Sequence, residues 1–302
     1  MKILITGGTG LIGKQLVNAL HKENHSIWVL TRGNAKTLDE RLCYVHWDGV
    51  TNEGWGALLS TMDVVINLAG EPLTRWPWTK NQKKIFAESR VLAGGALSKS
   101  IQETTHRPKF LLQVSGINHY GIFGESATEY TPPGTDYLAC LTQDWENSTS
   151  IVETLGVRRC VTRLAVVLDR KGGLFPLMAL PIRLFFGGPD GSGEQIVPWI
   201  HIEDVIGAIS FLIYDENARG PYNLVAPEII TNADFNKNIA REFKRPYWFR
   251  IPAFLLKLIL GEMSVLILGG RGAYPERLVR AGYKFKFTTL QAAVKDLQKK
   301  ND

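Results

Sequence analysis

Four closely spaced glycines follow directly on an apolar run at the start of the chain. The run Lys2 to Thr6 has the pattern of a buried parallel strand, and Leu11 to Leu20 has that of an amphipathic helix. The glycines between them fit both G-x-G-x-x-G and the overlapping variant T-G-x-x-G-x-x-G: Gly7, Gly8, Gly10 and Gly13. Such a turn lets backbone amides at a helix N-terminus approach a pyrophosphate. The sequence therefore predicts a dinucleotide-binding loop, with an ordinary glycine turn as the alternative.

The end of the second apolar run indicates which dinucleotide binds. His25 to Leu30 has the pattern of the next strand, and Thr31 and Arg32 follow where an NAD-binding chain usually carries an acid for the ribose 2′-hydroxyl. The Arg32 guanidinium suits a 2′-phosphate instead, so we expect NADP; a solvated surface charge is the alternative. Asp48, after the run Leu42 to Trp47, is a candidate acceptor for the adenine amine, or else forms a turn with the glycine that follows it.

Composition and charge exclude several classes of protein. With 302 residues, 45% of them hydrophobic, the chain can bury a large core in one domain or two interlocked domains. The formal charge of +6 is spread along the chain, so we expect no nucleic-acid partner. Three cysteines without C-x-x-C spacing predict no metal site and fit a reducing cytoplasm, and the first run leaves no room for a signal peptide. Lys257 and Glu262 interrupt the most apolar stretch, Phe254 to Leu268, so we expect a buried helix pair and no membrane partner.

Apolar strand-like runs alternate with helical patterns through the first half of the chain. Further strands are expected at Met62 to Leu68, Phe110 to Ser115 and Arg159 to Leu164, and helices at Lys80 to Gln102 and Asp136 to Leu155. The alternation predicts an α/β fold, a doubly wound parallel sheet of the Rossmann type, with a smaller C-terminal region that covers the substrate. We expect an NADP-binding domain over 1–168 and a mixed region over 169–302, of which about 199–226 packs back on the first domain.

Several motifs together resemble the extended short-chain dehydrogenase/reductase superfamily, of the NAD-dependent epimerase/dehydratase type. They are the glycine fingerprint, Asn67 to Gly70, Ser115 after an apolar strand, and Trp199 to Asp204. Further motifs resemble an atypical epimerase-like subgroup with a C-terminal domain of unknown function: Asn67 to Pro72, Ser89-Arg90, Gly187 to Pro189, Gly191 to Gly193, Gly261-Glu262 and Pro275 to Leu278. The resemblance implies that NADP contacts Gly7, Thr9, Gly10, Leu11, Ile12, Gly13, Thr31, Arg32, Leu68, Ala69, Gly70 and Arg90.

The chemistry that the resemblance implies depends on two side chains. Members of the superfamily hold the substrate oxygen with a Ser or Thr, and a Tyr-x-x-x-Lys pair exchanges a proton while a hydride moves to or from the nicotinamide. Ser115 stands where that Ser belongs, and Tyr137 lies on the next predicted helix. Leu141 replaces the Lys four residues on, so the ammonium that would lower the pKa of the tyrosine is missing. A packed aromatic is the alternative for Tyr137.

Four other polar residues are candidates for the site. His119 and Tyr120 follow Ser115 on a loop, where either could contact a substrate. His201 is expected to fix the start of the helix that follows it. Arg271 could bind an anionic group of the substrate, or else is a surface or ion-pair residue.

Two functions are consistent with these residues. The first is an NADP(H)-dependent oxidoreductase or nucleotide-sugar-epimerase-like enzyme that acts on a small carbonyl, alcohol or sugar substrate. The alternative is a catalytically impaired NADPH-binding protein that reports the redox state to a partner. The glycine fingerprint supports both functions. Leu141 stands in place of the usual lysine, which favours the second function.

Overall fold

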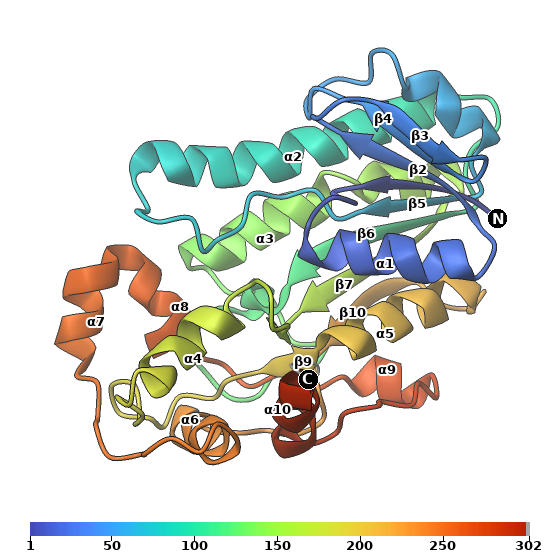
Figure 1. Ribbon diagram of the computed structural model, residues 1–302. Helices are drawn as coiled ribbons and strands as arrows, with labels where there is room; N and C mark the ends of the chain where they lie inside the picture. The colour runs from blue at the N-terminus through green and yellow to red at the C-terminus, as the bar shows by residue number, and fades with distance from the viewer. Residues whose placement is uncertain (300–302) are drawn as a thin grey trace.

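The predicted strands assemble into one large sheet, which confirms the α/β, doubly wound fold class (Figure 1). The computed structural model describes residues 1–299. The strands lie in the order β10-β7-β6-β5-β1-β2-β4-β3, and all neighbours are parallel except β3 and β4. Their bounds are β1 (Lys2–Thr6), β2 (Ser26–Thr31), β3 (Lys36–Asp39), β4 (Leu42–His46), β5 (Val64–Asn67), β6 (Phe110–Gly116), β7 (Arg158–Leu164) and β10 (Gly220–Leu224).

Helices cover both faces of this sheet. Ile3 and Ile5 of β1 share a core with α1 and α5, whereas Leu4 between them shares a core with α2 on the other face. This alternation along one strand is why parallel strands buried on both faces read as continuous apolar runs. The helices and 3₁₀ turns of these layers are α1 (Leu11–Lys22), η1 (Gly56–Thr61), α2 (Lys80–Glu103), η2 (Ile117–Tyr120), α3 (Tyr137–Asn147), η3 (Ser150–Leu155) and α5 (Ile202–Tyr214).

The sheet and the helices on its two faces form the first layer of the molecule. A second layer, built mainly from the C-terminal half of the chain, lies below α5 in Figure 1. It contains a small parallel sheet of β8 (Val166–Leu168) and β9 (Trp199–His201), with its own core around Phe175, Trp199 and Phe235. Its helices are α4 (Phe175–Arg183), α6 (Asn232–Glu242), α7 (Ala253–Leu260), η4 (Gly261–Ser264), α8 (Val265–Leu268), α9 (Glu276–Arg280) and α10 (Leu290–Lys299). The division of the chain at residue 168 stays a prediction, but β10 completes the main sheet beside β7.

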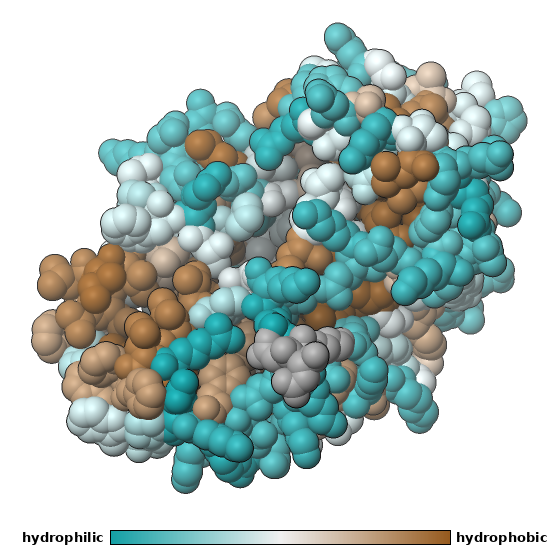
Figure 2. Space-filling view, in the orientation of Figure 1, coloured by the Kyte–Doolittle hydropathy of each residue, from teal (hydrophilic) through white to brown (hydrophobic). Residues whose placement is uncertain are grey.

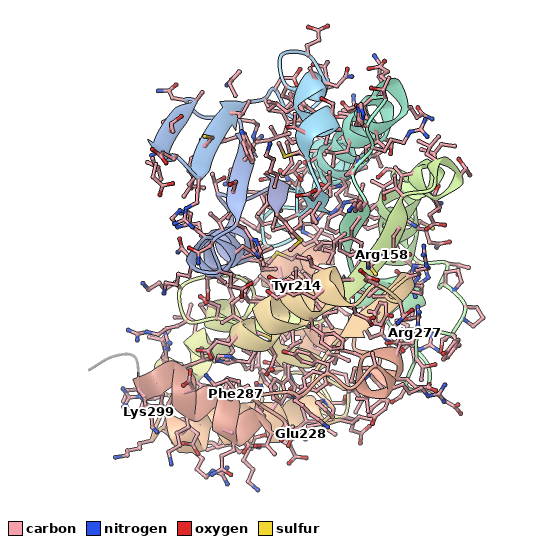
Figure 3. All side chains as sticks on the ribbon, turned by 90° about the vertical axis from the view of Figure 1, so that its right-hand side faces the viewer. Arg158, Tyr214, Glu228, Arg277, Phe287 and Lys299 are labelled. Carbon is pink, nitrogen blue, oxygen red and sulfur yellow. The ribbon has the colours of Figure 1, made fainter. Side chains whose placement is uncertain are left out.

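One buried carboxylate ties the two layers together. Asp204 of α5 accepts hydrogen bonds from the backbone amides of Lys286 and Phe287, at 2.7 and 2.9 Å. Glu228 accepts from the amide of Leu290 at 2.6 Å and so holds the start of α10. Figure 3 shows Phe287 and Glu228 in the lower layer, below α5. The C-terminal segment is thus fixed relative to the sheet.

Three expectations about the elements need correction. The helix expected over Asp136 to Leu155 ends at Asn147 and continues as η3, because hydroxyls there bond back to carbonyls; Ser148 Oγ donates to the Trp145 carbonyl at 2.7 Å. The short edge strand β3 was not predicted, since all its residues are exposed and it has no apolar run. The helix pair expected over Phe254 to Leu268 forms as α7 and α8, but no residue of either helix is buried. Within residues 1–299, every helix is too short or too polar to span a bilayer.

Candidate functional site

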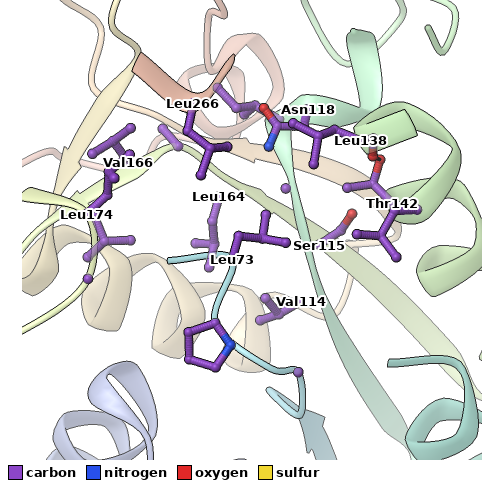
Figure 4. Close-up of a pocket in the computed structure, with 18 of the residues that line it drawn as sticks. Leu73, Val114, Ser115, Asn118, Leu138, Thr142, Leu164, Val166, Leu174 and Leu266 are labelled. Carbon is purple, nitrogen blue, oxygen red and sulfur yellow. Dashed lines mark hydrogen bonds between the residues drawn. The ribbon is translucent and has the colours of Figure 1, made fainter. Parts of the chain in front are cut away.

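A cavity of about 410 Å³ opens at the carboxyl ends of the parallel strands (Figure 4). It lies beside β1 and β5, where the strand order reverses, which is where doubly wound sheets bind their ligands. Its walls come from the loop after β1, the ends of β5, β6 and β7, one face of α3, and α8 with the loop that follows it. The site therefore draws on both layers of the molecule.

The glycines of the loop after β1 serve different purposes. Gly7 has a φ of +67°, and a Cβ there would lie 2.6 Å from the Leu68 carbonyl oxygen. A Cβ on Gly13 would lie 2.2 Å from the Gly7 carbonyl oxygen, so this glycine lets α1 pack against the loop. A Cβ on Gly10 would meet only that same oxygen, at 3.2 Å, and Gly10 lines the cavity. Gly7 and Gly13 thus hold the shape of the loop, whereas Gly10 leaves space for a ligand.

The predicted cofactor residues fall into two groups by position. Those that line the cavity are Gly7, Gly10, Leu11, Ile12, Gly13, Leu68, Gly70 and Arg90. Those outside its walls are Thr9, Thr31, Arg32, Asp48 and Ala69. Thr31 ends β2, Arg32 follows it, and Asp48 comes shortly after β4; both strands lie on the side of β1 away from β5. They lie along the same edge of the sheet as the cavity, and their contact with a cofactor stays a prediction.

Arg32 and Asp48 differ in the hydrogen bonds that their side chains make within the protein. Arg32 is exposed. The Asp48 carboxylate accepts hydrogen bonds from the amides of Val50 and Thr51, at 2.7 and 2.8 Å, and from the Thr51 hydroxyl at 2.8 Å. These hydrogen bonds lower the pKa of Asp48. They make the turn that the sequence left as the alternative, and a contact between Asp48 and an adenine amine stays a prediction.

Arg90 is a buried cation in the cavity wall. Its side chain donates to the Phe86 carbonyl at 2.9 Å and lies 4.7 Å from the centre of the Trp145 ring. Burial lowers the pKa of Arg90 to about 10, and no salt bridge to a carboxylate forms within residues 1–299. The indole Nε1 of Trp145 is also buried there, and no acceptor among the described residues, 1–299, reaches it. Buried donors of this kind are normally satisfied, so both side chains leave hydrogen-bonding capacity for a ligand.

A buried carboxylate holds the hydroxyl of Ser115, which lies in the cavity wall at the end of β6. Ser115 Oγ donates to Glu146 Oε1 at 2.8 Å. Arg163 binds the same carboxylate with Nε to Oε1 at 2.8 Å and Nη2 to Oε2 at 2.9 Å. Burial alone would raise the pKa of Glu146, but the hydrogen bonds and charge of Arg163 outweigh it and lower that pKa. Because the Ser115 hydroxyl donates its hydrogen bond to the Glu146 carboxylate, its oxygen can accept a hydrogen bond from a ligand.

His119 and Tyr120 lie behind this pair and do not line the cavity. His119 Nδ1 is 3.4 Å from Glu146 Oε1, and burial lowers the pKa of His119 to about 4, so the ring is neutral at pH 7. The Tyr120 hydroxyl donates to Asn223 Oδ1 at 2.7 Å and accepts from Arg163 Nη1 at 2.9 Å. Neither residue is placed for the substrate contact considered from the sequence. Both instead support the ion pair that holds Ser115.

Tyr137, the predicted proton carrier, also lies outside the cavity wall. Its hydroxyl donates to the Lys83 carbonyl at 3.4 Å, and its ring packs edge-on to Trp78 with the centres 6.1 Å apart. Burial raises the pKa of the phenol, whereas a proton carrier needs a lower one. Asp136 caps α3 and fixes its rotation, so that the face toward the cavity begins one residue later, at Leu138. Tyr137 thus has the surroundings of the packed aromatic that the sequence left as the alternative, and its role as proton carrier stays a prediction.

The cavity face of α3 carries neither a tyrosine nor a lysine. It is formed at helical spacing by Leu138, Leu141, Thr142 and Trp145. The Thr142 hydroxyl donates to the Leu138 carbonyl within the helix. Beside Leu138 of this face, Asn118 of η2 has a side-chain amide that makes no hydrogen bond within residues 1–299 (Figure 4). The polar groups open to a ligand on this side are thus Ser115, Asn118 and Thr142, among apolar neighbours.

Among the residues of the site that sequence reasoning missed are Asn118, Thr142, Trp145 and Glu146. The rotation of α3 could have been read from its N-cap, because Asp136 is a favoured capping residue and sets the first helical position. Glu146 gave no local signal, since its partners are 31 and 17 residues away along the chain.

Two of the remaining candidates have structural roles. His201 Nδ1 accepts from the Glu203 amide at 3.2 Å, which confirms the predicted helix start. Arg271 lines the cavity, but its Nε and Nη1 donate to the carbonyl oxygens of Glu125 and Tyr120, at 2.7 and 2.5 Å. Its guanidinium therefore holds two loops together. No group of His, Cys, Asp or Glu within residues 1–299 is arranged to hold a metal ion.

Comparison with known proteins gives matches over nearly the whole chain. Residues 3–225 match the model of the NAD dependent epimerase/dehydratase family, and residues 251–297 match a domain of unknown function, DUF1731. An epimerase family protein of Staphylococcus haemolyticus is 35% identical over 298 residues, which cover 98% of both chains.

Solved structures agree with these matches. The human epimerase family protein SDR39U1, crystallised with NADPH, has a TM-score of 0.87 at 29% identity and 99% coverage of both chains. A nucleoside-diphosphate sugar epimerase of Corynebacterium glutamicum has a TM-score of 0.80 at 28% identity, over 98% of this chain and 58% of that one. The UDP-glucose 4-epimerase of Thermus thermophilus in complex with NAD, with a TM-score of 0.76 at 16% identity, shares the fold alone.

Proposed function

Because the chain belongs to the NAD dependent epimerase/dehydratase family, we propose that it is an NADP(H)-dependent oxidoreductase acting on a small apolar carbonyl or alcohol. One observation carries the proposal. A single cavity joins the glycine loop at Gly7 to Gly13 with the Ser115 hydroxyl, and apolar side chains surround the space between them. A dinucleotide on the loop would bring its reactive end into that space.

The residues present fit a phosphorylated dinucleotide. Gly10 leaves room where a side chain would block the approach of a pyrophosphate, and Arg90 is a buried cation that forms no salt bridge in residues 1–299. Arg32, exposed at the end of β2, is suited to a 2′-phosphate, which favours NADP over NAD. The similarity to SDR39U1, whose crystal structure contains NADPH, supports the same cofactor.

In this proposal two side chains would hold the reacting oxygen of a substrate. When bound, the nicotinamide supplies or accepts the hydride. The free amide of Asn118 can donate to a carbonyl oxygen, and the Ser115 oxygen can accept from the hydroxyl of the corresponding alcohol. No tyrosine or lysine of α3 lines the cavity, so we assign the proton that balances hydride transfer to a carbonyl to solvent.

The walls of this end of the cavity favour an apolar substrate over a nucleotide sugar. They are formed by Leu73, Val114, Leu138, Leu141, Leu164, Val166, Leu174, Val265 and Leu266 (Figure 4). The diphosphate of a nucleotide sugar needs cations with free donors. The cations of the cavity wall in residues 1–299 are Arg90 and Arg271. We assign Arg90 to the dinucleotide, and two backbone carbonyls already occupy the guanidinium of Arg271.

The test is turnover of NADPH with a panel of substrates. Apolar aldehydes and ketones should oxidise NADPH, and UDP-sugars should not. Asn118→Leu preserves the size of the side chain but removes the donor, so it should lower turnover while NADPH affinity stays unchanged. In the same experiment Arg32→Ala should weaken NADPH binding by about 10- to 100-fold, as expected for one lost charge-assisted contact, and leave NADH binding nearly unchanged.

Two results would overturn the proposal. Equal affinities for NADPH and NADH in the wild type would contradict the cofactor assignment. Binding of NADPH without turnover of any substrate in the panel would replace the enzyme by the alternative of a dinucleotide-binding protein, which membership of this family does not favour.

A further inference from the structure

The second layer displays an apolar surface on the outside of the molecule, over α4 and α7 (Figure 2). We call the surface of α4, residues 184–189 and residues 243–260 the apolar basic face. Its exposed large apolar side chains are Leu177, Leu180, Leu184, Phe185, Phe186, Trp248, Phe254, Leu258 and Ile259. Phe254 and Leu258, one helical turn apart on α7, are 71% and 79% exposed. A soluble surface rarely gathers so many large apolar groups without a partner.

The fold holds the aromatic part of this face in a fixed position. Phe185 has a φ of +70°, a conformation that a bulky residue adopts only where the surroundings enforce it. The indole of Trp248 donates to the Phe185 carbonyl at 3.0 Å, and the Arg245 guanidinium lies 4.4 Å from the centre of the Phe185 ring. Even so, Phe185 and Trp248 are 53% and 68% exposed. These contacts hold aromatic groups toward solvent instead of burying them.

Anchors on both sides keep α7 outside the core. Before the helix, the Ile251 amide donates to the Pro189 carbonyl at 3.0 Å and the Gly191 amide donates to the Ile251 carbonyl at 2.8 Å. After it, Met263 is buried in the cluster that contains Trp78. No residue of α7 itself is buried. The apolar helix is thus supported at its ends and left open along its length.

The charged residues within the segments that form this face, and directly before α4, all have one sign. Residues 170–189 and 243–261 contain no Asp or Glu, and their basic residues are Arg170, Lys171, Arg183, Lys244, Arg245, Arg250 and Lys257. Three of these arginines, at 170, 183 and 245, line one surface hollow of about 610 Å³. None of the seven forms a salt bridge within residues 1–299. The surface combines a concentrated positive charge with protruding apolar side chains.

We propose that the apolar basic face docks on an anionic lipid bilayer. Its leucine, isoleucine and phenylalanine side chains would enter the acyl region, Trp248 would lie at the interface, and the arginines and lysines would contact lipid phosphates. A second copy of the chain fits less well, because a two-fold contact would set the same cluster of positive charges against itself.

This inference reverses the expectation of no membrane partner. That expectation concerned a spanning segment, which Lys257 interrupts. A helix that lies in the interface needs no such length, and a lysine beside its apolar side chains suits a phosphate headgroup. The proposal goes beyond the proposed function and does not depend on cofactor binding or turnover.

The experiment is flotation of the full chain with lipid vesicles. The protein should float with vesicles of phosphatidylcholine and phosphatidylglycerol, not with phosphatidylcholine alone, and high salt should release it. Leu258→Ser should lower the partition coefficient about 10-fold, since a leucine side chain leaves the acyl region. Leu38→Ser, at an exposed leucine on β3, is the matched control and should change nothing.

A charge reversal separates the electrostatic contribution to vesicle binding from the contribution of the apolar side chains. Lys257→Glu should lower binding to the anionic vesicles at least about fivefold. Its control is Lys80→Glu at the start of α2, which should have no effect. Unchanged NADPH affinity and thermal midpoint show that each variant is folded.

Either of two outcomes would contradict the proposal. In the first, the folded wild type fails to float with anionic vesicles at low salt, or Leu258→Ser and Lys257→Glu both float to the same extent as a wild type that does float. In the second, the protein forms a dimer that Leu258→Ser dissociates and does not float, which identifies the face as an interface between copies of the chain.

Discussion

A side chain at Gly10 should abolish NADPH binding while the protein stays folded. Gly10 is the N-cap of α1 with a φ of −76°, which any residue can adopt, and it provides no side-chain cap. A Cβ there approaches only the Gly7 carbonyl oxygen, at 3.2 Å. In Gly10→Ser the hydroxyl can accept a hydrogen bond from the first turn of α1, so we expect the free energy of unfolding to rise by a few tenths of a kcal/mol, within about 0.5 kcal/mol.

The same side chain stands in the path of the pyrophosphate. Loss of two charge-assisted hydrogen bonds to phosphate, at about 1.5–3 kcal/mol each, amounts to about 3–6 kcal/mol, or roughly 10²- to 10⁴-fold in affinity. Stability and binding should therefore change in opposite directions. Gly13→Ala should instead destabilise the protein, because its Cβ would lie 2.2 Å from the Gly7 carbonyl oxygen.

Fluorescence titration of NADPH and thermal unfolding of the apoprotein measure the two effects. Gly95→Ser is the matched control, since a Cβ built at this position of α2 meets no side chain and no other element of residues 1–299 within 4 Å, and its NADPH affinity should equal that of the wild type. If folded Gly10→Ser binds NADPH as tightly as the wild type does, the glycine loop is an ordinary turn and the assignment of the cofactor site is wrong.

Three further predictions follow from the polar groups near the cavity. Tyr137→Phe should leave any reductase rate unchanged, because Tyr137 lies outside the cavity wall; a large drop in turnover would restore it as the proton carrier. Glu146→Gln should lower the free energy of unfolding by about 3–5 kcal/mol in denaturant titrations, since it leaves the buried Arg163 without its counter-ion. His119 has a folded pKa of about 4 against 6.5 when unfolded, so the unfolded chain binds the proton first as the pH falls. Stability should therefore decrease from pH 6.5 toward 4, by at most about 3 kcal/mol from this group, and His119→Gln should show a shallower slope between pH 6.5 and 5.

The parts of the fold that the sequence predicted are those fixed by local pattern. Lys2 to Thr6 was predicted with its observed bounds, because a parallel strand covered on both faces is apolar throughout. The glycine loop was predicted because its spacing and its place between strand and helix occur together. The exposed edge strand β3 gave no such pattern.

The rest depends on contacts that are distant in sequence. Whether Tyr137 or Leu138 faces the cavity is decided by the rotation of α3, and one residue changes the direction by about 100°. Glu146 becomes important only when the sheet brings Ser115 and Arg163 to it. The apolar composition of Phe254 to Leu268 indicated burial, yet composition alone does not say whether protein or another phase covers an apolar helix.

The short helix α8 belongs to two surfaces at once. Its Val265 and Leu266 line the cavity, and the four residues of η4 join it to α7 on the apolar basic face. Suppose that contact with lipid shifts α8 and that a ligand in the cavity prefers one position of this helix. Binding of the ligand must then change the affinity of the protein for lipid by the same factor by which lipid changes its affinity for the ligand. Attachment to a bilayer and occupancy of the cavity would then be reciprocally coupled, so that vesicles alter the dissociation constant of a substrate and the substrate alters the fraction of protein on vesicles.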